Sequence, residues 1–151
     1  MGAAIEIQTI SQRMEALGLG FMSAGLESFL SEQSHAELPL SEVIARLIEL
    51  EYIPRKERAA RTRLKLSGMP QAKLLEDFDL SWLKGGLTQR KFSELSSLAF
   101  IQRKENIVLL GPSGIGKTHL LLGLGHKACL NGYSAYYLSC MDAIEQLLRI
   151  R

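Results

Sequence analysis

Residues 106–118 read Asn-Ile-Val-Leu-Leu-Gly-Pro-Ser-Gly-Ile-Gly-Lys-Thr, and the order of residue types in this stretch decides the fold of the C-terminal half of the chain. The continuous apolar run 107–110 is bounded by glycine, which predicts a buried strand. The apolar-rich residues 117–130 end at an Asn-Gly pair, which predicts a helix with a clear C-terminal stop. A glycine-rich loop, residues 111–118, therefore joins a strand to a helix.

This loop matches the pattern G-x-x-x-x-G-K-[ST] in full, and its residue types suit phosphate binding. Glycine permits positive φ and leaves no Cβ between backbone N–H groups and a phosphate, so the N–H groups can form an anion nest at the positive end of the helix. Lys117 suits the β- and γ-phosphates of a nucleotide, and the Thr118 hydroxyl suits Mg²⁺. The residues predicted to bind the cofactor are Gly111, Pro112, Ser113, Gly114, Ile115, Gly116, Lys117 and Thr118, with Thr118 also the predicted metal ligand.

Two alternatives stay open at the loop. The first is a glycine-rich turn between a strand and a helix that binds no ligand, although the position of the motif favours nucleotide binding. The second concerns His119, which lies in the first turn of the predicted helix. We favour a packing or solvent-facing role for this side chain over proton transfer.

The residues around the loop predict alternating helices and strands. Residues 88–103 carry apolar side chains at helical spacing, and residues 133–138 are aromatic and strand-like. Ser139 and Asp142 form a Ser-x-x-Asp capping box for a last helix. We therefore predict an α/β fold for residues 88–151, the opening β-α-β-α part of a P-loop domain.

A helical region and a linker are predicted before this domain. Apolar residues recur at steps of three and four through residues 1–66, which is typical of helices. Gly18 and Gly20 divide the first run into two short helices, and Pro54 is expected to kink or restart a later one. Residues 67–87 contain Gly and Pro and mix acidic with apolar side chains, so we interpret them as a linker.

The formal net charge of +2 hides a strongly basic block. Residues 1–53 hold two basic and eight acidic residues, whereas residues 54–73 hold seven basic residues and Glu57 alone. Crowded like charges repel unless an anion neutralises them, so we favour contact with nucleic-acid phosphates. A solvated charged face or contact with an acidic protein is the alternative. The residues predicted to contact DNA are Arg55, Lys56, Arg58, Arg61, Arg63 and Lys65.

Several patterns are absent from the sequence. The N-terminus has no basic segment followed by an apolar core, and no apolar stretch approaches the roughly 20 residues that span a bilayer. Two cysteines are too few for a disulfide framework, so we expect a soluble cytoplasmic protein. After Thr118 no acidic residue ends an apolar strand, and an acid at such a place holds Mg²⁺ and orients water in P-loop enzymes. We therefore expect no nucleotide hydrolysis by residues 1–151 alone.

The stretch 106–119, followed by Leu120 and the Gly123-Leu-Gly125 step, resembles the IstB-like ATP-binding proteins. These are helper ATPases of insertion-sequence transposases and are similar to DnaC-type helicase loaders. The helical N-terminus, the arginine-rich block and residues 75–79 (Leu-Glu-Asp-Phe-Asp) match the family's order of parts. The resemblance covers essentially the whole chain but only the first part of a full-length member, because the sequence stops before the Walker B strand, the sensor residues and the arginine finger.

The resemblance implies an AAA+ ATPase that binds ATP through its Walker A loop, assembles on DNA as a homo-oligomer and delivers a transposase to its target. It also implies that Phe78 lies near the adenine. A helicase loader in DNA replication is the alternative within the class. A non-catalytic fragment that binds DNA or a partner through residues 1–66 is the alternative outside it.

Overall fold

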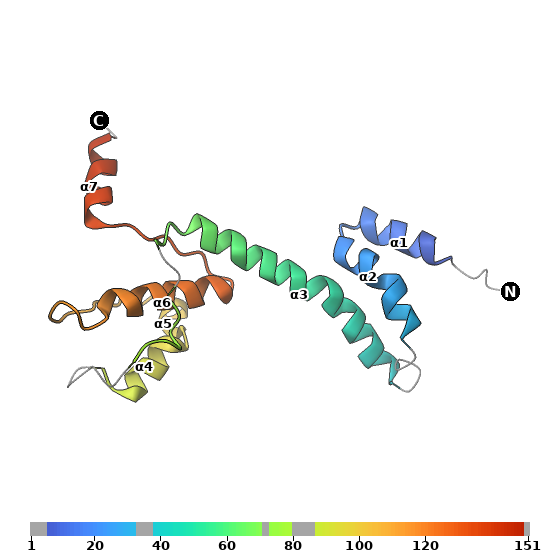
Figure 1. The fold of residues 1–151 in the computed structure, drawn as a ribbon, viewed down its shortest axis with the longest axis horizontal. Coiled ribbons are helices and arrows are strands. Elements are labelled where there is room, and N and C mark those ends of the chain that lie inside the picture. The colour runs from blue at the N-terminus through green and yellow to red at the C-terminus, as the bar shows by residue number, and fades with distance from the viewer. Residues whose placement is uncertain (1–5, 33–37, 71–72, 80–86, 150–151) are drawn as a thin grey trace. The chain divides into compact units, whose positions relative to one another are not determined.

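The computed structural model describes four ranges of the chain: 6–32, 38–70, 73–79 and 87–149 (Figure 1). The chain divides into two compact units, Met1–Arg58 and Ala59–Arg151. Helix α3, Leu40–Leu66, contributes to both units, because the boundary between them falls inside it. Within the described ranges, no helix combines the length and the apolar character that a membrane crossing requires.

In the first unit, helix α1, Ile7–Ala16, packs against helix α2, Gly20–Ser31. The chain turns between them at Gly18, which has φ +74°, so the prediction of two short helices is confirmed. The Oγ atoms of Ser11 and Ser23 lie 2.8 Å apart and join the two helices by a hydrogen bond. The buried apolar side chains of α2 are Met22, Leu26 and Phe29.

A buried carboxylate ties α3 to the start of α2. Glu51 Oε2 accepts hydrogen bonds from the N–H groups of Phe21 (2.9 Å) and Met22 (3.0 Å). Its Oε1 accepts from Arg55 at 2.7 Å, and Arg55 also donates to the Gly18 carbonyl. The hydrogen bond from the Met22 N–H has the largest effect and lowers the pKa of Glu51. Burial acts in the opposite direction and raises the pKa, and Arg55 lowers it further. The carboxylate thus caps α2, where N–H donors attract negative charge.

Helix α3 runs unbroken through Pro54, so the expectation that the helix restarts there is wrong. Proline removes the N–H that would bond the carbonyl of Leu50, one turn earlier. Glu51 and Arg55 pair with each other across the same turn, at i and i+4. Their network with the start of α2 stabilises the helix where proline weakens it.

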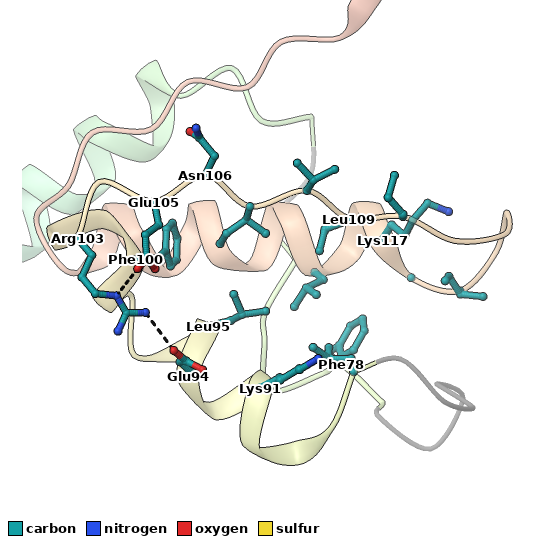
Figure 2. A pocket seen from close by; sticks show the side chains of 17 residues that line it. Phe78, Lys91, Glu94, Leu95, Phe100, Arg103, Glu105, Asn106, Leu109 and Lys117 are labelled. Atoms are coloured by element: carbon teal, nitrogen blue, oxygen red, sulfur yellow. Dashed lines mark hydrogen bonds and ion pairs between the residues drawn. The ribbon is translucent and has the colours of Figure 1, made fainter.

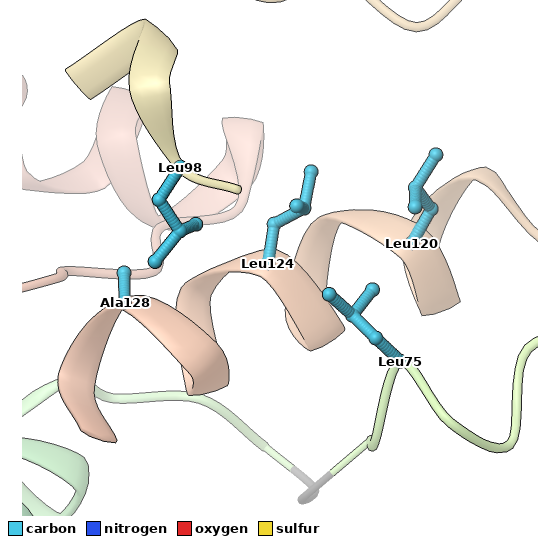
Figure 3. Close-up of a cluster of buried hydrophobic side chains, with 5 residues drawn as sticks. All are labelled: Leu75, Leu98, Leu120, Leu124 and Ala128. Carbon is cyan, nitrogen blue, oxygen red and sulfur yellow. The ribbon is translucent and has the colours of Figure 1, made fainter. Parts of the chain in front are cut away.

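Helix α6, Lys117–Leu130, lies at the centre of the second unit and confirms the helix predicted for these residues. Its side chains at every fourth position project from successive turns into one buried cluster (Figure 3). Leu98 joins this cluster from the chain between two short helices, and Leu75 joins it from the segment 73–79. The buried members are Leu75, Leu98, Leu120, Leu124 and Ala128.

The single helix predicted for residues 88–103 is in fact two helices, α4 (Gln89–Ser96) and α5 (Ala99–Gln102). The break occurs at Leu98, which adopts a left-handed conformation with φ +60°. Such a conformation is strained for leucine. Only 4% of the side chain remains exposed, so burial in the cluster offsets the strain. The periodicity of apolar residues did not predict this break, because the break results from the packing of Leu98 against another part of the chain.

Helix α7, Cys140–Arg149, begins where its capping pattern predicts. The Asp142 N–H donates to Ser139 Oγ at 3.1 Å, and Ser139 Oγ in turn donates to the Asp142 carboxylate. These two bonds confirm the Ser-x-x-Asp cap.

The strands predicted at 107–110 and 133–138 are not formed in the described part of the chain, so the α/β prediction is not confirmed. A strand needs a partner backbone within hydrogen-bond reach. Residues 107–110 have no such partner among the described residues. The segment 133–138, which follows α6, is bonded to the residue after α3 and not to a strand. There the Tyr137 N–H donates to the Ser67 carbonyl at 2.7 Å.

The segment 107–110 nevertheless keeps the side-chain alternation of a strand. Ile107 and Leu109 pack against the buried cluster on α6. Val108 and Leu110, between and after them, are 75% and 87% exposed. The apolar run therefore covers α6 with one face while the other face stays open, and the alternation has the two-residue period of an extended chain.

The described part of residues 67–79 packs closely against α6. A Cβ at Gly123 would lie 2.7 Å from Leu75 Cδ2, and one at Gly125 would lie 3.1 Å from Met69 Sδ. Glycines in the interior of α6 therefore leave the space that this segment occupies. Ser67, at the end of α3, is fully buried. The described part of the predicted linker is therefore packed against α6.

The Glu51 network predicts an acid-sensitive first unit. Because the pKa of Glu51 is lower in the folded chain, the carboxylate stabilises the fold above its unfolded pKa of about 4.3, and the stabilisation is lost as the pH falls through the folded value. We expect Glu51→Gln to lower the melting temperature near pH 7, and the difference from the wild type to shrink toward about pH 3.

Circular dichroism melts across this pH range measure the effect. Glu49→Gln, an exposed neighbour on α3, serves as the matched control and should change the melting temperature little at any pH. A difference between Glu51→Gln and wild type that stays constant with pH would contradict the account.

Candidate functional site

The loop 111–118 reaches the start of α6 through glycines in left-handed backbone conformations. Gly114 and Gly116 each have φ +85°, and Gly116 is the N-cap residue of α6. Residues with a Cβ rarely adopt such angles, so the loop depends on glycine at both positions.

The first turn of α6 leaves its N–H groups open. Among the described residues, no side chain caps this end of the helix. In the described part of the chain, Leu120 is the first residue of α6 whose N–H meets a backbone carbonyl, that of Gly116 at 2.9 Å. The donors of residues 117–119 therefore face the end of the helix where the macrodipole is positive. Such an end is suited to an anion.

Lys117 supplies the cation of the loop. Its Nζ donates to the carbonyl of Gly111 at 2.8 Å and to that of Pro112. The ammonium thus lies over the loop to which it belongs, held by neutral carbonyls. A phosphate would bind the same group more strongly, because the attraction between opposite charges adds to the hydrogen bond. The exposed Thr118 follows on the first turn of α6. Glycine backbone, open donors and ammonium together fit a phosphate group.

A cavity of about 460 Å³ opens beside the loop (Figure 2). Gly116 and Lys117 are among the residues that line it, and most of the other lining side chains are apolar. This volume and lining are typical of sites for small organic ligands. The apolar wall residues are Phe78, Leu87, Leu95, Phe100, Ile107, Val108, Leu109, Leu110, Ile115 and Leu120.

Three charged side chains stand together in the lining of the same cavity (Figure 2). Arg103 donates to Glu105 at 2.9 Å and to Glu94 at 3.1 Å. The bond to Glu105, followed by the bond to Glu94, raises the pKa of Arg103 above its ordinary value. About half of each side chain is exposed, so these pairs add little stability. They brace α4 against the chain that leaves α5.

Phe78 forms the wall of the cavity next to the loop. A Cβ at Gly116 would lie 2.9 Å from Phe78 Cε2, so the ring rests directly on the glycine. The resemblance implied that Phe78 lies near a bound adenine, and the ring lines the same cavity as Lys117.

Arg55 and Arg63, two of the residues predicted to contact DNA, bond groups of the protein that hold its own fold together. Arg55 pairs with the buried Glu51. Arg63 Nε donates to the carbonyl of Cys129 at 2.9 Å. That carbonyl lies in the last turn of α6, so the guanidinium places a positive charge at the negative end of the helix dipole. Both arginines therefore have structural roles.

The other four predicted DNA contacts are exposed on α3. Lys56 Nζ lies 5.7 Å from the centre of the Tyr52 ring, a cation–π contact. Arg58, Arg61 and Lys65 follow one another at steps of three and four residues, which places them along one side of the helix.

The sequence patterns did not indicate the role of Arg63 or the composition of the cavity walls. Arg63 is one positive charge within a basic block, and nothing local separates it from its neighbours. A usable signal existed for the segment that packs on α6, since glycines inside a predicted helix mark close approach by another part of the chain. Gly123 marks the approach of Leu75, and Gly125 marks that of Met69.

Comparison with known proteins places these features in one family. Residues 12–151 match the family model described as IstB-like ATP binding protein. The match covers most of the helical N-terminal region, the whole basic block and the loop.

Several relatives are insertion-sequence proteins named for ATP binding. The chain is 35% identical to the protein of insertion sequence IS5376 from Geobacillus stearothermophilus, over 94% of this chain and 56% of the relative. It is 32% identical to that of IS21 from Pseudomonas aeruginosa, over 97% of this chain and 54% of the relative. The identity to the protein of IS232 from Bacillus thuringiensis is 29%, over 95% of this chain and 57% of the relative. The chain therefore spans a little over half the length of these relatives.

The two left-handed glycines give a matched test of the loop. We expect Gly116→Ala to lower the free energy of unfolding more than Gly114→Ala. Both place a Cβ at φ +85°, which costs about 1–2 kcal/mol. Only at Gly116 does the new Cβ also meet a side chain, because nothing lies within 4 Å at Gly114. Urea unfolding measures both losses.

A second substitution isolates the contact with the ring. Phe78→Ala removes the atoms that a Cβ at Gly116 would meet, so in the double variant part of the Gly116→Ala loss should be recovered. Equal losses at the two glycines, with no coupling to Phe78, would show that the ring does not rest on the loop.

Proposed function

The chain belongs to the family of IstB-like ATP-binding proteins, and from this premise we propose that it binds ATP together with Mg²⁺ through residues 111–118. We propose further that it is part of a transposition helper ATPase, which acts with a transposase on DNA and assembles with copies of itself. The insertion-sequence names of its relatives support this role. The activity and partners of a protein of the relatives' full length belong to the proposal, because the chain spans a little over half of them.

The observation that carries ATP binding is the open first turn of α6 beside a loop of left-handed glycines. In the proposal, the N–H groups of the loop and of residues 117–119 hold the phosphates. Lys117 leaves the carbonyls of its own loop and binds the β- and γ-phosphates. Thr118 offers its hydroxyl to Mg²⁺, which neutralises charge on the phosphates when bound.

The cavity beside the loop is our proposed place for the nucleoside. It is lined by Gly116 and Lys117 and continues between apolar walls. Phe78 is a wall residue with an aromatic face next to the loop, which suits a planar base. The volume of about 460 Å³ is within the range of small-ligand sites.

DNA contact is assigned to the side of α3 that carries Arg58, Arg61 and Lys65. These side chains are exposed and share a side of the helix, as contact with a phosphate backbone requires. Arg55 and Arg63 are left out of this assignment, because Arg55 pairs with the buried Glu51 and Arg63 donates to a carbonyl in the last turn of α6.

Lys117→Ala tests nucleotide binding. Loss of the ammonium removes a charge-assisted bond to the phosphates, so we expect the affinity for a fluorescent ATP analogue with Mg²⁺ to fall at least about tenfold. Fluorescence titration measures the affinity, and circular dichroism checks that the variant folds.

Lys127→Ala removes a lysine from the other end of α6 and is the matched control. It should bind the analogue like the wild type. Equal affinity of the wild type and Lys117→Ala would mean that the analogue binds away from the loop, and the proposal for residues 111–118 would then fail.

The basic side of α3 predicts a salt-dependent interaction with DNA. Each phosphate contact contributes a slope of about −0.9 to the logarithm of the binding constant against that of the salt concentration. We expect the Arg61→Gln, Lys65→Gln double variant to bind a random-sequence duplex more weakly, with a slope shallower by about two. Fluorescence anisotropy across a salt series gives both quantities.

Arg46→Gln, an exposed arginine paired with Glu42 on the same helix, is the control for charge alone. It should leave the slope unchanged. If both variants lowered the slope alike, the interaction would reflect net charge and not the side of α3 proposed here.

A further inference from the structure

Three aromatic rings meet beside the loop. Phe78 stacks on Phe92 of α4, with ring centres 5.7 Å apart and planes 11° from parallel. The ring of His119 meets Phe78 edge-on, at 5.4 Å and 83°. Phe78 is thus held between a ring from α4 and one from the first turn of α6, the turn whose N–H donors are open.

His119 also holds the main chain that carries Phe78. Its Nε2 lies 2.9 Å from the carbonyl oxygen of Leu74. A carbonyl only accepts hydrogen bonds, so Nε2 carries the proton and donates. One imidazole therefore contacts this segment twice, at the backbone of Leu74 and at the ring of Phe78.

The segment needs such support, because it has no regular structure of its own. Residues 73–79 contain a single turn, in which the Phe78 N–H donates to the Leu75 carbonyl at 3.1 Å. Leu75 anchors the middle of the segment against Gly123. The position of the Phe78 ring over Gly116 then depends on the contacts of His119 and Phe92.

We propose that His119 is a positioning residue of the nucleotide site: it fixes the Phe78 ring in the wall of the cavity beside Gly116, where the ring contacts the heteroaromatic base. This inference rests on the proposed function. It assigns His119 a role in binding the base and not in proton transfer. The phosphates are bound by the loop, so His119 governs the part of the affinity that the nucleoside supplies.

Binding of two probes separates these contributions. ATP contains both base and phosphates, whereas inorganic tripolyphosphate contains the phosphates alone. Calorimetric titration with Mg²⁺ gives both affinities for the wild type, His119→Ala, His119→Gln and Phe78→Ala. We expect Phe78→Ala and His119→Ala each to weaken ATP binding about tenfold, as loss of aromatic stacking on a base does, with tripolyphosphate binding unchanged.

Two comparisons show whether His119 acts through Phe78. The double variant of His119→Ala and Phe78→Ala should bind ATP no more weakly than either single variant, because both remove the same contact. His119→Gln keeps a side-chain N–H donor for the Leu74 carbonyl and should recover part of the affinity. Thermal melting shows whether each variant is folded. If His119→Ala does not fold, the comparison of His119→Gln with the wild type provides the test.

The contrary results are distinct. Unchanged ATP affinity in folded His119 variants, equal weakening of both probes, or fully additive losses with Phe78→Ala would each overturn the positioning role while leaving ATP binding by the loop intact. Failure of the wild type to bind either probe would instead overturn the proposed function, and the role of His119 with it.

Discussion

Close contact between helix α6 and the chain that precedes α4 is the constraint on which the second unit depends. Three glycines allow it: a Cβ at Gly116, Gly123 or Gly125 would lie 2.9, 2.7 or 3.1 Å from the nearest side-chain atom of Phe78, Leu75 or Met69. Burial of one leucine is worth about 2 kcal/mol, so Leu75 repays part of the cost of glycine in a helix. The same contact carries Phe78 to the glycine that begins α6. Packing of the core and construction of the candidate site are therefore one arrangement.

Both ends of α6 are matched to its dipole. At the N-terminus, open N–H donors and Lys117 favour an anion. At the C-terminus, the carbonyl of Cys129 accepts from Arg63 of α3. An arginine of the basic block thus stabilises the helix that begins at the proposed phosphate site. The first unit uses the same physics with opposite sign, since the carboxylate of Glu51 caps the N-terminus of α2.

Local patterns predicted the parts of this structure that local forces decide. Helical periodicity and capping residues were sufficient for residues 117–130 and for the cap at Ser139, because the atoms involved lie within one or two turns. The helix break at Leu98 was not predicted, and α3 does not restart at Pro54, since burial in a cluster and a network with another helix override the local preference there. Strands at 107–110 and 133–138 require a partner backbone, and no local pattern shows whether one is present.

The loop motif of the candidate site could be predicted from the sequence because its residues are contiguous. The cavity walls were not, because they come from separate segments that only the folded chain brings together.

In the proposed function, the loop and the first turn of α6 bind the phosphates of ATP. Nuclear magnetic resonance of the nitrogen-15-labelled chain, titrated with ATP and Mg²⁺, tests it residue by residue. The account predicts that the largest amide shifts fall on residues 113–119, whose N–H groups would meet the phosphates. Shifts confined to the basic residues 55–65, as a non-specific polyanion would produce, would contradict it.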